Sequence, residues 1–157
     1  MIELQTTMPG LPRPQGSVKP MFNKKSGTGF VKYADATIEH RNNLIAWLAR
    51  EWHGHQGFGV TPSIEGSVTV MVTFGFERPK SHYRTGKNAH LLRDDAPQDH
   101  IQAPDTDKLQ RLVGDALEQA GVLANDSQIS NWLATKVWVD RGGETGTAIT
   151  VASRRDA

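Results

Sequence analysis

The feature that most constrains the fold is a run of alternating apolar residues near the middle of the chain. Every second position from Val68 to Phe76 is valine or phenylalanine, and the positions between hold threonine, methionine and glycine. Because side chains alternate between the two faces of a strand, this run predicts a β-strand with one buried face. That face needs a second layer of structure to cover it.

A second periodic run predicts an amphipathic helix over residues 108–120. Its apolar residues recur at the helical spacings i, i+3, i+4 and i+7, and Gly121 follows them as a C-terminal cap. Asp107 suits the N-cap of this helix. The apolar positions are Leu109, Leu112, Val113, Ala116, Leu117 and Ala120.

Four weaker patterns complete the expected architecture. Alternation over Ile2–Met8 predicts a first strand, and a helical pattern covers residues 35–52. Alternation over 135–139 and 147–151 predicts two strands that pair as a terminal hairpin. The resulting order predicts one α+β domain over residues 1–157, with a mixed sheet and two main helices.

Two long segments between these elements are polar and basic. Residues 9–29 are rich in proline and glycine and predict a loop. Residues 78–104 exceed the roughly 12 to 15 residues of ordinary loops, which favours a functional or disordered segment. Their cations are candidate phosphate contacts, although a solvated loop surface explains any single one of them equally well. The candidates are Lys19, Lys24, Lys25, Lys80, Arg84 and Lys87.

The composition excludes several kinds of site and of cellular location. The chain has no cysteine, which excludes disulfides and thiolate metal sites, and its formal net charge is only +1. It lacks both a run of about 20 apolar residues and a signal-peptide pattern, so we expect a cytoplasmic protein without a membrane partner. We expect the histidines on the surface and the tryptophans in packing or a subunit contact.

Three aspartates form the main candidate site. Asp105 and Asp107 open the second helix, and Asp126 follows 19 residues after Asp107. A helix of about 13 residues spans roughly 20 Å, so the following turn must fold Asp126 back, or Asp126 must meet the other two across a subunit boundary. Such a cluster suits Mg²⁺, which prefers carboxylate oxygens. The alternative is that all three are ordinary cap and turn residues.

The residues around these aspartates resemble the signature of RusA-type Holliday-junction resolvases, D-x-D-N-L-x-K, then D-A-L, a glycine and D-D-x-Q-[VI]. The matching segments are 104–111, 115–117, Gly121 and 125–129. The chain departs from the signature where Lys108 replaces the asparagine, Arg111 replaces the family lysine and Asn125 replaces the first aspartate of D-D.

The resemblance implies a homodimeric endonuclease that resolves four-way DNA junctions by paired symmetric nicks in recombination and repair. Asp105, Asp107 and Asp126 would bind Mg²⁺, or Mn²⁺ in its place, and act in catalysis. The catalytic cation is Lys108 or Arg111. The family occurs in phages, prophages and bacteria. Two alternatives remain open, a metal nuclease acting on other branched DNA and a DNA-binding module without catalysis.

Overall fold

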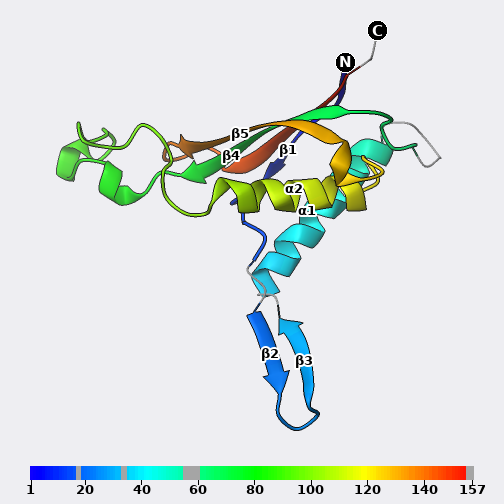
Figure 1. Cartoon of the computed structure of the whole chain (residues 1–157). Coiled ribbons are helices and arrows are strands. Elements are labelled where there is room, and N and C mark those ends of the chain that lie inside the picture. The colour runs from blue at the N-terminus through cyan, green and yellow to red at the C-terminus, as the bar shows by residue number, and fades with distance from the viewer. Residues whose placement is uncertain (17–18, 33–34, 55–60, 155–157) are drawn as a thin grey trace.

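In the computed structural model, two helices cover one face of a four-stranded sheet (Figure 1). Residues 1–16, 19–32, 35–54 and 61–154 are described, those at 19–21, 29–32 and 35 by their backbone alone. The helices and strands are β1 (Ile2–Pro9), β2 (Lys19–Asn23), β3 (Thr28–Lys32), α1 (Asp35–His53), β4 (Val68–Glu77), α2 (Thr106–Gln119), β5 (Ile129–Val139) and β6 (Gly146–Ser153). The single α+β domain with a mixed sheet is confirmed.

Strand β4 is the centre of the sheet, whose order is β1-β6-β4-β5. It pairs with β6 in the antiparallel sense and with β5 in the parallel sense. The alternate apolar residues of β4, from Val68 to Phe76, are all at least 94 % buried. The strand and the face that the sequence predicted to be buried are therefore confirmed.

The predicted terminal hairpin is wrong. Strands β5 and β6 do not pair with each other, because β4 lies between them. The six residues from Asp140 to Thr145 cross the end of β4, and strands about 4.8 Å apart make a crossing of roughly 10 Å that six residues span easily. Alternation predicted the strands themselves, but it carries no information on which strand fills the space between them.

The helices pack their apolar stripes under the sheet. Leu44 and Leu48 of α1 and Leu109, Val113 and Leu117 of α2 are at most 1 % exposed. On the opposite face of the sheet, the described residues leave Met71 37 % and Leu133 52 % exposed. In the described part of the chain, no helix is long and apolar enough to cross a membrane.

Helix α2 begins two residues earlier than predicted. Asp105 is its N-cap, with an extended backbone, and its carbonyl accepts the first helical hydrogen bond from the Leu109 N–H at 3.2 Å. Asp107, predicted as the N-cap, lies instead in the first turn. At the other end Gly121 (φ +75°) closes a Schellman motif, in which the Val122 N–H bonds to the Leu117 carbonyl at 3.0 Å.

The loop predicted over residues 9–29 is confirmed only in part: residues 10–16 have no helix or strand, whereas residues 19–32 form a β-hairpin. Strands β2 and β3 pair from Lys19 with Lys32 to Asn23 with Thr28, and the hairpin projects away from the body (Figure 1). The Asn23 side chain accepts a bond from the Lys25 N–H at 2.9 Å and so supports the turn. The signal missed in the sequence is this Asn-x-x-x-Gly turn between two short apolar pairs.

The excursion, residues 78–104, is ordered against the end of β5. It contains two short 3₁₀ turns, η2 (Lys80–His82) and η3 (Gly86–Asn88), and an isolated bridge from Tyr83 to Leu92. The Trp138 indole N–H donates to the Asp99 carbonyl at 3.0 Å. This packing holds the excursion beyond the N-terminal end of α2 (Figure 1).

Candidate active site

The first two candidate aspartates lie together at the exposed N-terminal end of α2. Asp105 makes no side-chain capping bond, and its carboxylate pairs with the Lys108 ammonium at 2.8 Å. The hydrogen bond from Lys108, and then its charge, hold the pKa of Asp105 below its ordinary value, and the same bond raises the pKa of Lys108. Asp107 lies in the first turn of the same helix, where the helix dipole stabilises its negative charge.

Lys136 of β5 binds the segment that precedes this helix. Its ammonium donates to the Gln102 carbonyl at 2.7 Å and to the Pro104 carbonyl at 3.0 Å. Its positive charge also lowers the pKa of Asp105, although less than Lys108 does. Lys136 was not predicted from the sequence. The feature that could have pointed to it is a lysine on the inward face of a strand, between Ala134 and Trp138, because an ammonium group there needs polar partners.

Asp126 lies at the opposite end of α2. It begins the short 3₁₀ turn η4 (Asp126–Gln128), and its backbone N–H donates to the Glu118 carboxylate in the last turn of the helix at 3.1 Å. The Gln128 amide secures this turn, because its nitrogen donates to the carbonyls of Ile64 and Gly66 at 2.8 and 3.0 Å. The turn therefore places Asp126 beside the C-terminal end of α2 and does not bring it back toward Asp105.

The length of α2 decides whether one protomer can bring the three aspartates together. The helix has 14 residues, which span about 21 Å. Among the described residues, no group of three or more histidine, aspartate or glutamate side chains is placed to hold a metal ion. Asp105 and Asp107 alone supply two neighbouring carboxylates, a donor set that suits a hard cation completed by water and phosphate. The role of Asp126 stays a prediction.

Arg111 is a cation of this helix whose charge is not paired with a carboxylate in the described structure. It is exposed and forms no ion pair within the described part of the chain. Asp115, one turn later, accepts a bond from the Gln15 side chain at 2.9 Å and makes no ion pair with Arg111 in the described structure. Arg111 lies one turn after Asp107, and residues four apart share a helix face.

The predicted phosphate contacts are distributed over two regions. Lys24 and Lys25 are exposed at the turn of the β2–β3 hairpin, whereas the side chain of Lys19 lies outside the described residues. Lys80 and Lys87 are exposed on the excursion. Arg84 pairs with Asp94 at 2.7 Å, so its charge is already partly compensated.

Two histidines expected on the surface are buried. His82 and His100 are 7 % and 6 % exposed, and their rings pack on Trp138 at centroid distances of 5.1 and 4.1 Å. Burial lowers the pKa of His100, which favours its neutral form. His53 is half-buried and bonded to the Ala120 carbonyl at 3.1 Å, and His55 lies outside the described residues. Trp138 packs as expected, and the histidines serve the packing of the excursion.

The chain matches a known protein family. The family model described as endodeoxyribonuclease RusA matches residues 12–152 of the 157-residue chain. The matched range contains α2, all three candidate aspartates and all six candidate phosphate contacts. A search of curated proteins found no match.

The Lys108–Asp105 pair is testable by titration. Replacing Lys108 with methionine removes the two largest causes that lower the pKa of Asp105, so that pKa is expected to rise toward its ordinary value. The measurement is an NMR titration of the side-chain carboxyl carbons. Arg111→Met is the matched control, because Arg111 does not contribute to the Asp105 shift. An unchanged Asp105 titration in Lys108→Met would show that the pair does not form in solution.

Proposed function

The chain belongs to the RusA endodeoxyribonuclease family, and on that premise we propose that it cuts branched DNA, with four-way junctions as its main substrate. The observation that carries the proposal is the pair Asp105 and Asp107 on an exposed helix end, with the exposed Arg111 guanidinium one turn away. Phosphodiester hydrolysis needs these two kinds of group, carboxylates for a metal ion and a cation for the phosphate charge.

We infer that the acidic centre is completed by a second copy of the chain. Asp105 and Asp107 lie at one end of α2, and Asp126 lies at the other. A two-fold axis perpendicular to α2 near its midpoint makes the two helices antiparallel. Each pair then faces Asp126 of the partner subunit, and two equivalent sites form at once. Two sites related by this axis suit a four-way junction, whose paired nicks need two cuts.

The donor set fits Mg²⁺, or Mn²⁺ in its place. Asp105, Asp107 and the partner subunit's Asp126 would hold the ion, which supplies Lewis acidity at the phosphate and an activated water. Lys108 pairs with one oxygen of the Asp105 carboxylate, so it would hold that side chain in place and would move aside if that oxygen bound a divalent cation. Lys136 keeps the backbone before Asp105 in position.

The surroundings of the acidic pair are suited to hold the DNA arms. Lys24 and Lys25 project on the β2–β3 hairpin, and Lys80 and Lys87 lie on the excursion beyond α2 (Figure 1). Lysines contact phosphates without reading the base sequence, so these two regions fix the position of the arms. They lie on different parts of the protomer, which fits a branched substrate better than one straight duplex.

The direct test is a cleavage assay with matched substrates. The wild-type protein is expected to nick a four-way junction in the presence of Mg²⁺ and to leave linear duplex intact. Asp126→Asn is expected to bind the junction with nearly unchanged affinity and to lose cleavage, because the amide keeps the shape of the side chain and removes its negative charge. Flap and fork substrates in the same assay measure the preference for branch geometry.

Three outcomes of that assay would contradict the proposal. Equal cutting of linear duplex would remove the branch specificity, and faster cutting of flaps than of junctions would replace the main substrate. Metal-independent binding without cutting of any substrate would identify a DNA-binding module instead.

The structure favours Arg111 over Lys108 as the cation that acts on the phosphate. Lys108 is bound to Asp105 at 2.8 Å, whereas Arg111 is exposed and forms no ion pair in the described part of the chain. Arg111→Ala is therefore expected to lower single-turnover cleavage by about 10²- to 10³-fold, the usual cost of losing one preorganised donor. Arg111→Lys is expected to retain much more activity, because it keeps the charge.

Lys108→Ala is the matched variant on the same helix turn, and its expected loss is smaller than that of Arg111→Ala. Junction affinity is measured separately for each variant, so that weaker binding is not mistaken for slower chemistry. A crippled Lys108→Ala beside a nearly normal Arg111→Ala would reverse the assignment.

A further inference from the structure

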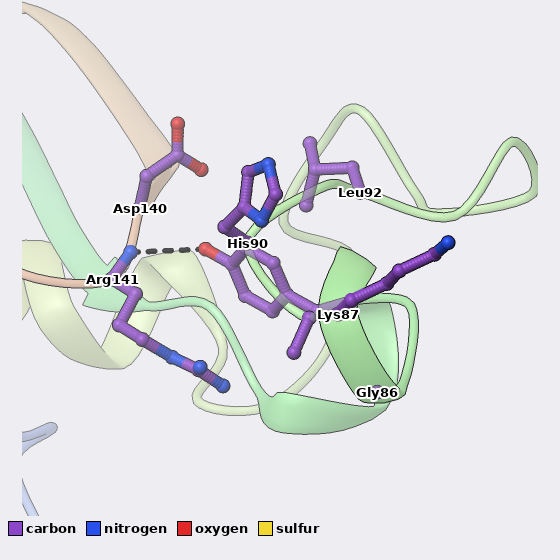
Figure 2. A pocket seen from close by; sticks show the side chains of 8 residues that line it. Gly86, Lys87, His90, Leu92, Asp140 and Arg141 are labelled. Atoms are coloured by element: carbon purple, nitrogen blue, oxygen red, sulfur yellow. Dashed lines mark hydrogen bonds between the residues drawn. The ribbon is translucent and has the colours of Figure 1, made fainter.

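A cavity lies between the excursion and the turn that joins β5 to β6, apart from the acidic pair (Figure 2). Its volume is about 450 Å³, within the roughly 300 to 1,000 Å³ of typical small-ligand sites. Tyr83 is among its lining residues, Arg141 lies on one side, His90 on another, and Lys87 reaches outward (Figure 2). The cavity is too small for a duplex arm and large enough for one nucleotide.

Two cations of this cavity are available for an anion. The Arg141 guanidinium lies over the Tyr83 ring at 4.9 Å, and the Arg141 backbone N–H donates to the Tyr83 hydroxyl at 2.9 Å. This stacking orients the guanidinium without neutralising it. Neither Arg141 nor Lys87 forms an ion pair among the described residues, whereas two neighbouring arginines of the excursion, Arg84 and Arg93, are paired with aspartates at 2.7 Å.

The remaining wall favours a nucleotide over a bare phosphate. Leu92 and Ala89 offer apolar contacts that a phosphate cannot use. Asp140 also lines the cavity and would repel an isolated anion. One of its oxygens accepts a bond from Arg78 at 3.2 Å, and the other makes no bond within the described structure. A carboxylate oxygen in this setting is an acceptor for the amino group of a base.

Strand β5 connects this cavity to the acidic pair. Lys136 holds the carbonyl before Asp105, and Asp140 and Arg141 follow four and five residues later in the chain. At about 3.3 Å per residue the separation along the chain is about 13 to 17 Å. A strand of duplex DNA carries one phosphate per about 3.4 Å of axis, so the separation from Lys136 to these two residues corresponds to about four or five nucleotides.

We propose that this cavity binds one unpaired nucleotide of the DNA strand that passes Asp105. Lys87 and Arg141 take its phosphate, Leu92 and Ala89 contact the base, and Asp140 accepts from the base amino group. In a paired strand the base is turned into the duplex, and only the phosphate could enter, leaving the apolar wall and Asp140 unused. This inference rests on the proposed function, since it takes branched DNA as the substrate.

The test uses the full chain and a four-way junction in which 2-aminopurine replaces one base at a time along an arm. This analogue is quenched by stacking and brightens when it leaves the duplex. The assay runs in EDTA at saturating protein, so it needs no cleavage. Wild-type protein is expected to brighten one position in each contacted strand, and Lys87→Ala combined with Arg141→Ala is expected to lose most of that increase.

Lys24→Ala combined with Lys25→Ala is the matched control, which removes two lysines far from the cavity. It is expected to weaken junction binding and to keep the increase at saturation. Lys87→Met alone is a second variant, and because its side chain is exposed it is expected to fold normally and to lose part of the increase.

The proposal is overturned if no position brightens with the wild-type protein, or if the increase survives unchanged in the Lys87 and Arg141 variant. Brightening at one position by a protein that never cuts with Mg²⁺ would refute the proposed nuclease activity and leave the nucleotide site standing. Cutting without brightening would do the reverse.

Discussion

The burial of helix α2 under the sheet is the constraint on which the site depends. Leu109, Val113 and Leu117 are almost completely buried, so the helix is held as a rigid rod against β4 and its neighbours. A rod of 14 residues separates its ends by about 21 Å. Asp105 and Asp126 are attached to these opposite ends, and no side-chain rotation closes such a gap. The same packing that makes the chain stable therefore keeps these aspartates apart within it, and the proposed acidic centre needs a second copy to complete it.

Strand β5 is the second element on which the site depends, because residues in it and just after it contact the acidic pair's backbone, the buried histidines and the cavity. Lys136 binds the carbonyls before Asp105, Trp138 packs against the buried histidines, and Arg141 follows at the cavity. Polar residues on the inward side of this strand cost desolvation unless each finds a partner. Those partners are the backbone carbonyls of the excursion, which explains why a long polar segment is ordered here.

Local patterns in the sequence predicted the elements well and their spatial relations poorly. The alternation of β4 and the stripe of α2 identified the buried faces, since both depend on spacing alone. The order β6-β4-β5, the β2–β3 hairpin and the burial of His100 depend on contacts between distant segments, which periodicity does not encode. For the site, the sequence proposed the three aspartates, did not point to Lys136, and left open whether Asp126 turns back or meets a second subunit.

The central claim is that each acidic centre combines residues of two subunits, and a purified heterodimer tests it most directly. One subunit carries Asp105→Asn and the other Asp126→Asn, each with its own affinity tag, and junction nicking is measured with Mg²⁺. If the centre is shared, one site has both changes and the other has none, so the heterodimer nicks at about half the wild-type rate while both mutant homodimers are inactive. A heterodimer as inactive as its parents would place all three aspartates within one subunit and contradict the account.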